Sequence, residues 1–242
     1  MSTSETTWPW ERLNQGNVGA HGVLTTLLEP RAGERWLDVG TGGGGLAIQV
    51  ARSGAEVVGV DIAEDGLEHA RTAAAEAGVA ATFLYGDAQE LPFEDASFDG
   101  IGSAFGVIFA ADDERAAAEL GRVCKPGGKL GLTLMPLDSR TGELFTLLRR
   151  YGLRLPHPGR WSEQAEALLS DEFELQVERR ESAERAPVRS WEESLQTFAP
   201  LRAVTSRLDD AASATLRTEF EALEERFRDV MPTYVVALGK RR

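Results

Sequence analysis

The chain has 242 residues, of which 42% are apolar, and its formal net charge is −13. This length and apolar content fit one α/β domain with a sizeable core. The acidic balance argues against a nucleic-acid partner, which would need a basic face, so we expect none. Cys124 is the only cysteine, and His21, His69 and His157 lack ligand spacing. These counts exclude an intrachain disulfide and argue against a metal site.

The N-terminal sequence does not have the features of a targeting segment. It lacks a basic start and an apolar core, so we do not expect a signal peptide. The longest apolar run, residues 103–111, is far too short to span a bilayer. We therefore expect a cytoplasmic protein with no membrane span.

Strands and helices alternate along the first half of the chain. An N-terminal arm carries Trp8 and Trp10, which either pack on the domain surface or form a lid over a pocket. A helix is expected over 17–29. The alternation of strands and helices with short connections predicts a parallel sheet with right-handed crossovers, and the second strand is a nearly continuous apolar run, typical of a strand buried on both faces. The expected strands are 35–39, 56–60, 81–85, 98–103 and 129–135, with helices at about 45–53, 64–77 and 113–123.

The pattern changes after the fifth strand, which a turn at 125–128 precedes. Alternating apolar residues over 173–181 predict a half-exposed antiparallel strand. Ser190 with Glu193 fits the start of a capped helix that carries Trp191, Leu195 and Phe198. The remaining expected elements are a helix over 141–151, a proline-rich loop over 152–162, a helix over 211–228 and a last strand over 234–238.

A glycine-rich turn, Gly40 to Gly45, lies between the first strand and the next helix. Glycines there allow positive φ and close approach of a ligand, and the helix N-terminus attracts a polar or anionic group. The turn fits G-x-G-x-x-G of dinucleotide-binding proteins and equally D-x-G-x-G-x-G of methyltransferases, with Asp38 as the leading acid. Asp61 ends the second strand, where a carboxylate can accept from a ribose diol in both classes; its alternative role is to cap the next helix.

Asp87 ends the third strand, beside an apolar segment. A carboxylate there can accept from an exocyclic adenine amine, and the N–H of Ala88 or Gln89 can donate to a ring nitrogen. At this point the sequence resembles the class I S-adenosylmethionine-dependent methyltransferases, in particular the type 11 or UbiE-like small-molecule group. The resemblance rests on four segments in order and register, which are LDVGTGGG (37–44), VVGVDIAEDGLEHAR (57–71), GDAQELPFEDASFD (86–99) and LGRVCKPGGKL (120–130).

The resemblance implies a Rossmann-like three-layer α-β-α sandwich with helical cap insertions. Its seven-stranded, mostly parallel sheet would have the order 3-2-1-4-5-7-6, with the last strand antiparallel. The implied cofactor is S-adenosyl-L-methionine, and the product is S-adenosyl-L-homocysteine. The methionine part would lie on the glycine turn, the ribose and adenine at the next two strand ends, and the sulfonium near the end of strand four. The implied cofactor-binding residues are Asp38, Gly40, Thr41, Gly42, Asp61, Ile62, Asp87, Ala88, Ser103 and Ala104.

The expected organisation is a single methyltransferase domain over 1–242. Its parts are an N-terminal arm or lid (1–30), a cofactor-binding core (31–136), a variable acceptor or cap region with one strand (137–232) and a final strand (233–242). Aromatic residues of the variable region either line an acceptor pocket or form the core of the cap. They are Phe145, Trp161, Trp191 and Phe198.

We expect methyl transfer by in-line displacement to an O, N or C nucleophile of a small-molecule acceptor. Two alternatives are open. One is an NAD(P)-binding Rossmann oxidoreductase, for which no catalytic Tyr-x-x-x-Lys pair is evident; the other is a non-catalytic S-adenosylmethionine-binding protein. A base is needed only for a protonated acceptor, and His21 is the candidate, with a surface histidine as the other interpretation. The sequence does not indicate an oligomeric state.

Overall fold

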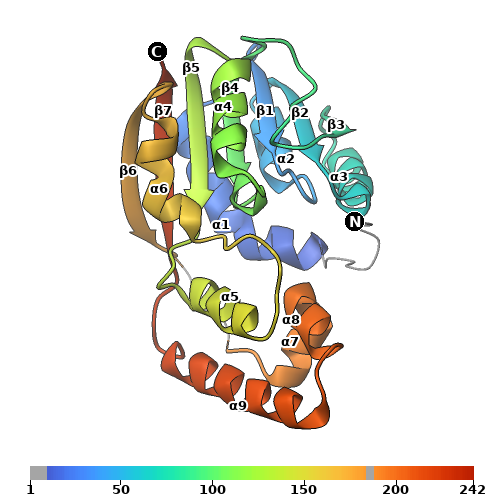
Figure 1. Cartoon of the computed structure of the whole chain (residues 1–242). Coiled ribbons are helices and arrows are strands. Elements are labelled where there is room, and N and C mark those ends of the chain that lie inside the picture. The colour runs from blue at the N-terminus through green and yellow to red at the C-terminus, as the bar shows by residue number, and fades with distance from the viewer. Residues whose placement is uncertain (1–9, 184–187) are drawn as a thin grey trace.

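The computed structural model describes residues 10–183 and 188–242, except for the side chains of residues 10–18. Within these ranges the chain folds around a seven-stranded sheet of order β3-β2-β1-β4-β5-β7-β6 (Figure 1). β7 is antiparallel to both neighbours and the other central pairs are parallel, which confirms the expected order and the antiparallel last strand. The strands are β1 Arg35–Val39, β2 Glu56–Asp61, β3 Thr82–Tyr85, β4 Phe98–Ala104, β5 Cys124–Leu134, β6 Phe173–Glu181 and β7 Thr233–Arg241.

Helices cover both faces of the sheet, so the core is a three-layer sandwich. One face packs on α1 (Trp10–Leu28), α2 (Gly45–Ala51) and α3 (Glu64–Glu76). The other face packs on α4 (Asp113–Val123) and α6 (Arg160–Leu169). The inner strands β1, β2 and β4 therefore bury side chains on both sides, whereas the edge strand β3 buries only Phe83. A short 3-10 turn, η1 (Val107–Phe109), follows β4.

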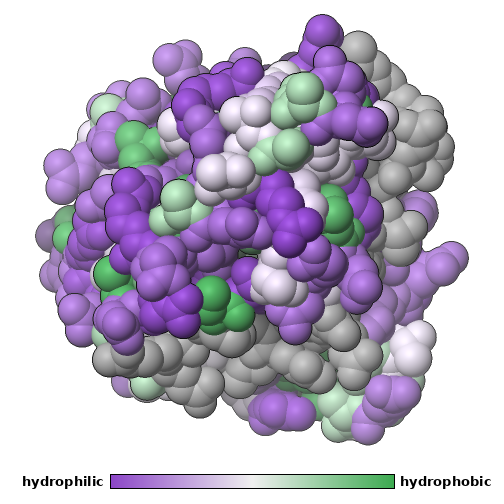
Figure 2. All heavy atoms as spheres, turned by 90° about the horizontal axis from the view of Figure 1, so that it is seen from below, coloured by the Kyte–Doolittle hydropathy of each residue, from purple (hydrophilic) through white to green (hydrophobic). Residues whose placement is uncertain are grey.

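A helical cap lies beyond the carboxyl ends of the parallel strands, below the sheet in Figure 1. It consists of α5 (Arg140–Arg150), α7 (Trp191–Thr197), α8 (Ala199–Thr205) and α9 (Asp210–Arg226). The cap has its own apolar core, in which the rings of Trp191 and Phe220 lie 5.5 Å apart. Seen from this side, the surface is mostly hydrophilic with isolated apolar side chains (Figure 2).

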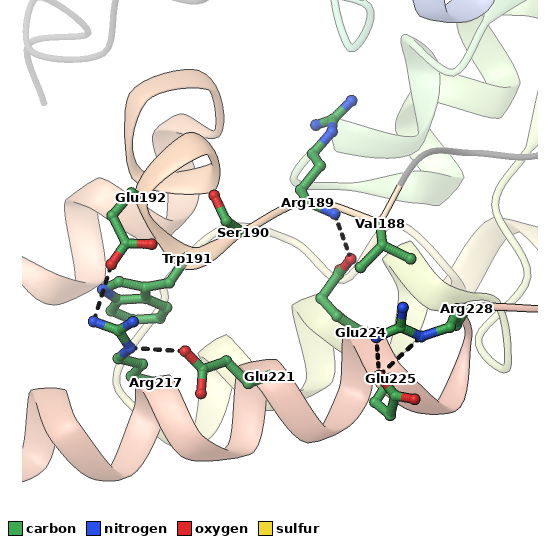
Figure 3. Close-up of a pocket in the computed structure, with 10 residues that line it drawn as sticks. All are labelled: Val188, Arg189, Ser190, Trp191, Glu192, Arg217, Glu221, Glu224, Glu225 and Arg228. Carbon is green, nitrogen blue, oxygen red and sulfur yellow. Dashed lines mark hydrogen bonds and ion pairs between the residues drawn. The ribbon is translucent and has the colours of Figure 1, made fainter.

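An ion pair joins α9 to α7, and a hydrogen bond joins α9 to the segment before α7, around a shallow hollow of about 380 Å³ (Figure 3). The buried Glu224 carboxylate accepts from Arg140 Nε at 2.9 Å and from the Arg189 backbone N–H at 3.1 Å. Arg217 pairs with Glu192 at 3.0 Å on α7. These contacts fix α9 against α5 and α7, so the cap is held by charge pairs as well as by its apolar core.

Four local expectations need correction. The first helix begins at Trp10 rather than at residue 17, and the lid role suggested for Trp8 and Trp10 falls on side chains outside the described residues. Helix α6 was missed, because a loop rich in proline and glycine precedes it. The segment over 125–128 belongs to β5, where the register shifts between Phe98 and Gly100. Phe198 does not continue α7 but separates it from α8.

Candidate cofactor site

The glycine turn after β1 is held by close backbone contacts that side chains would prevent. Gly40 has φ +67°, and a Cβ on it would lie 2.6 Å from Gly106 Cα, beyond the end of β4. The Thr41 N–H donates to Val60 O at 2.9 Å, which ties the turn to β2. Glycine is therefore required at position 40, because the ends of β1 and β4 approach each other closely.

Asp38 lies beneath this turn and is only 3% exposed. Its Oδ2 accepts hydrogen bonds from Thr41 Oγ1 at 2.7 Å and from the Ala47 N–H at 3.0 Å. Burial raises the pKa of this carboxyl to about 7, although both hydrogen bonds act against the rise. Within the described part of the chain, Oδ1 has no hydrogen-bond partner. One oxygen thus shapes the turn, and the other can accept from a ligand.

Asp61, at the end of β2, connects the turn to the next helix. Its Oδ2 accepts from the Gly42 N–H at 2.8 Å and its Oδ1 from the Ala63 N–H at 2.9 Å. Burial raises the pKa of this carboxyl as well. The N-cap residue of α3 is Ala63, which makes no side-chain hydrogen bond. Asp61 is therefore not the N-cap residue of that helix. The neighbouring Ile62 side chain is 46% exposed, which leaves an apolar surface beside the carboxylate.

Asp87 follows β3, and its carboxylate is held by Gln89, for which only a backbone role was expected. The Gln89 amide Nε2 donates to both Asp87 oxygens, at 2.9 and 3.0 Å, and the Gln89 N–H donates to Oδ1 at 2.9 Å. Gln89 Oε1 in turn accepts from the Asp112 N–H. An adenine amine would share Asp87 with Gln89, and Ala88 lies half-buried between them.

Ser103 and Ala104, at the end of β4, differ in how exposed their side chains are to a ligand. Ser103 is fully buried, and its hydroxyl donates to Val39 O at 2.6 Å and accepts from the Val107 N–H at 2.9 Å. Its hydroxyl is thus engaged within the protein, and a ligand could contact only its main chain. Ala104 is half-buried, and Phe105 after it has φ +58°, which is rare for a residue other than glycine.

His21 lies on α1 and is 5% exposed. Burial lowers the pKa of its imidazole to about 4, so the ring is neutral at physiological pH. His21 lies on the same side of α1 as the buried Leu24 and Leu28. The alternative expectation, that His21 is a surface histidine, is therefore wrong. In the described residues no hydrogen bond to either ring nitrogen is present. A buried, neutral imidazole with free ring nitrogens can accept a proton.

His157, in the loop before α6, is engaged locally. Its Nδ1 accepts from the Gly159 N–H at 3.1 Å, so Nε2 carries the proton and lies 2.9 Å from Thr146 Oγ1. Both ring nitrogens therefore have structural partners. No group of three or more His, Cys, Asp or Glu side chains in the described ranges is arranged to hold a metal ion.

The aromatic residues of the variable region are core residues. Trp161 is fully buried in the sandwich core, and its indole N–H donates to Asp113 Oδ1 at 2.9 Å. Phe145 is buried in the cap, where its ring lies 5.9 Å from that of Phe198. Phe109 of η1 lies 5.9 Å from Phe145 and connects the cap to the end of β4. Packing thus accounts for these residues without an acceptor.

The strand ends assemble one site along the carboxyl edge of the sheet. The glycine turn, Asp38, Asp61 and Asp87 come from three adjacent strands, and they meet where open α/β sheets bind ligands. A free carboxylate oxygen, two further carboxylates and the exposed Ile62 fit a ligand that carries an ammonium group, a ribose and a base. The chain thus has a Rossmann-like fold with a cluster of carboxylates around a glycine turn at the carboxyl edge of its sheet.

Comparisons with known proteins show what the chain is similar to. Residues 37–132 match the methyltransferase domain family, and the resemblance noted from the sequence is confirmed over that range. The demethylmenaquinone methyltransferase of Thermus thermophilus is 44% identical over 112 residues, which are 46% of this chain and 51% of that protein. An uncharacterised Mycobacterium tuberculosis protein is 36% identical over 147 residues, 59% of this chain and 54% of its own length.

The chain spans about half the length of the curated relatives it matches. Over the whole fold, the YcgJ protein of Bacillus subtilis superposes with a TM-score of 0.66 at 24% identity, covering 92% of this chain and 98% of that one. This similarity extends to the cap and supports the fold alone. In the described residues, no helix has both the length and the apolar character needed to cross a membrane.

Proposed function

We propose that the chain is an S-adenosylmethionine-dependent methyltransferase that acts on a small-molecule acceptor. The observation that carries the proposal is the connected set of Asp38, the glycine turn and Asp61. Asp38 and Asp61 bind the turn from two sides, at the Thr41 hydroxyl and the Gly42 N–H, and this set lies inside the range that matches the family. Asp38 keeps one oxygen for a cationic hydrogen-bond donor, which a methionine ammonium supplies and the pyridinium ring of NAD, whose charged nitrogen has no N–H, does not.

Each part of the cofactor is bound at the end of a different strand in this proposal. In this proposal Asp38, Gly40, Thr41 and Gly42 hold the methionine part, and Asp61 accepts from the ribose hydroxyls. Ile62 packs against the base, whose edge is read by Asp87 and Ala88. Ser103 and Ala104 border the sulfur, Ser103 through its main chain because its hydroxyl is engaged elsewhere.

When bound, the cofactor supplies a methyl group activated by a sulfonium. The chain's residues position the acceptor in line and exclude water, and the site needs no strong base. We assign proton removal to His21. An oxygen that has just gained a methyl group is a strong acid, so an imidazole with a pKa of about 4 can still take its proton.

The acceptor is a small molecule in this proposal because the cap and α1 lie across the carboxyl edge of the sheet (Figure 1), where they would enclose a ligand. The Thermus relative is named for a quinone-type acceptor, which is consistent with an acceptor of that size. The net charge of −13 disfavours a polyanionic partner.

Calorimetry with S-adenosylhomocysteine and, separately, with NAD tests the cofactor. We expect S-adenosylhomocysteine to bind and NAD not to bind; the reverse result would overturn the proposal in favour of an oxidoreductase. Transfer of a labelled methyl group from S-adenosylmethionine to a panel of phenols, quinols, amines and carboxylates then tests the activity. Tight cofactor binding with no transfer to any class would indicate a non-catalytic binding protein.

A further inference from the structure

Thr133, near the end of β5, has a hydroxyl without a partner. The residue is fully buried, and its Oγ1 has no hydrogen bond within the described part of the chain. A buried, unpaired hydroxyl costs about 1–3 kcal/mol, a cost that valine, with nearly the same shape, would avoid. The hydroxyl is therefore a candidate for a bond that forms only when a ligand is present.

Thr133 faces the same side of the sheet as α1. A Cβ on Gly131, two residues earlier in β5, would lie 2.6 Å from Leu28 of α1, and alternate residues of a strand share a face. Lys129 Nζ donates to Leu28 O at 2.6 Å, so the end of α1 lies at the start of β5. From there α1 runs back toward the carboxyl edge and crosses below the strands (Figure 1).

His21 lies two helical turns before Leu28, on the same stripe of α1. Seven residues of helix span about 10 Å, whereas the two residues from Gly131 to Thr133 span about 7 Å. The neutral imidazole thus lies toward the carboxyl edge from Leu28, on the face of the sheet that Thr133 also faces. Two buried polar groups that have no partner among the described residues thus lie on this face of the sheet, toward the edge where β4 and β5 end.

The surroundings of this pair are apolar. Ala104 of β4 and Val236 of β7 are the cross-strand neighbours of Thr133. The Thr133 carbonyl accepts from the Phe105 N–H at 3.2 Å, which holds Phe105 in its left-handed conformation. The Phe105 ring lies 6.4 Å from that of Tyr234, nearly edge to face. The described side chains of this set include no cation that could pair with an anionic acceptor.

We infer that the acceptor site lies between α1 and the ends of β4, β5 and β7, and that it takes a planar apolar molecule through a hydroxyl group. The Thr133 hydroxyl donates to the acceptor oxygen, and the His21 imidazole accepts the acceptor's proton. Phe105 and Tyr234 contact the ring of the acceptor. This inference rests on the proposed methyltransferase function and adds to it the acceptor class, a phenol or enol, and a specificity residue, Thr133.

The chemistry balances for O-methylation. A lone pair of the acceptor oxygen forms the new C–O bond as the C–S bond breaks, and the electron pair of that bond returns to sulfur, which gives neutral S-adenosylhomocysteine. The acceptor proton passes to His21, which becomes an imidazolium and releases the proton to solvent after the product leaves. No other reactant is needed.

Thr133→Val and Thr133→Ser, compared with the unmodified protein, test the inference, because a structural and a functional hydroxyl predict different results. The probes are 2-naphthol and its sulfur analogue 2-naphthalenethiol, a weaker hydrogen-bond acceptor, with labelled S-adenosylmethionine as donor. For Thr133→Val we expect a higher melting temperature, a KM for 2-naphthol raised about 10-fold, and an oxygen-over-sulfur preference lowered about 10-fold. Thr133→Ser keeps the hydroxyl and should keep the preference. Affinity for S-adenosylhomocysteine should not change in either variant.

An unchanged KM and an unchanged oxygen-over-sulfur preference in Thr133→Val would overturn the inference and leave the hydroxyl as an unpaired core group. Transfer to amines or carboxylates with none to phenols or naphthols would also overturn it, while the proposed methyltransferase function would stand. Failure of S-adenosylhomocysteine to bind the unmodified protein would instead refute the proposed function itself.

Discussion

Replacing Asp38 by asparagine should make the free protein more stable while weakening its cofactor site. The folded-state pKa of Asp38 is raised from 3.8 to about 7 by burial. The stability linked to this group is therefore fully present below pH 3.8 and is lost as the pH rises through 7. Asparagine is never ionised and keeps an oxygen that can accept from Thr41 Oγ1 and the Ala47 N–H.

The size of the effect follows from the pKa difference. At about 1.36 kcal/mol per pKa unit, ionising the buried carboxyl costs about 4 kcal/mol at pH 8. At pH 5 the folded carboxyl is largely protonated, and the cost falls to about 2 kcal/mol. We expect Asp38→Asn to exceed the unmodified protein in unfolding free energy by these amounts. Asp38→Ala, which removes the acceptor for both hydrogen bonds, should be less stable than Asp38→Asn at each pH.

Urea unfolding at pH 5 and pH 8 measures the stabilities, and calorimetry with S-adenosylhomocysteine at pH 8 measures the site. Loss of a carboxylate partner for the ligand ammonium should weaken binding by about 1.5–3 kcal/mol. If the extra unfolding free energy of Asp38→Asn over the unmodified protein does not grow between pH 5 and pH 8, the assignment of Asp38 as a buried carboxylate that ionises in this range is refuted. An unchanged affinity would refute its role toward the ammonium group.

Three further substitutions probe the same edge of the sheet. Asp61→Ala should weaken S-adenosylhomocysteine binding by ~1–3 kcal/mol in calorimetry, and unchanged affinity would mean that the ribose is bound elsewhere. Gly40→Ala should unfold at a clearly lower temperature, because its Cβ would lie 2.6 Å from Gly106 Cα. Gly19→Ala is its control: with nothing within 4 Å on α1, it should stabilise the protein by about 0.5–1 kcal/mol. Ser103→Ala should lower the free energy of unfolding by about 1–3 kcal/mol, since two buried backbone groups lose their partner; a neutral result would contradict that account.

The core of the fold could be predicted from sequence because its signals are local. The apolar run 56–60 and the break at Gly54, which has φ +84°, mark a buried strand after a helix. The capping box of Ser190 and Glu193 fixed the start of α7, and both of its hydrogen bonds are present in the structure. The sheet order, in contrast, came from family resemblance, because strand periodicity does not encode the order of neighbours.

What could not be predicted depends on contacts between distant segments. Thr133 looks like any polar residue in a strand, and its missing partner is evident only when α1 and β7 are in place. Gln89 is likewise an ordinary loop residue until Asp87 and Asp112 meet it. The burial of His21 follows from the packing of α1 on the sheet. In each case the chemistry is set by tertiary surroundings that have no signature in neighbouring residues.

The strands β6 and β7 are paired along their whole length, from Phe173 with Arg241 to Glu181 with Thr233, and the Ser182 N–H donates to Pro232 O. Helices α7 to α9 therefore leave and re-enter the sheet at one point, as an extended loop within a β-hairpin. Such an excursion can be exchanged or reshaped while the hairpin remains closed. The cap can thus diverge in sequence and size without disturbing the strand ends at the carboxyl edge, where we propose that the cofactor binds.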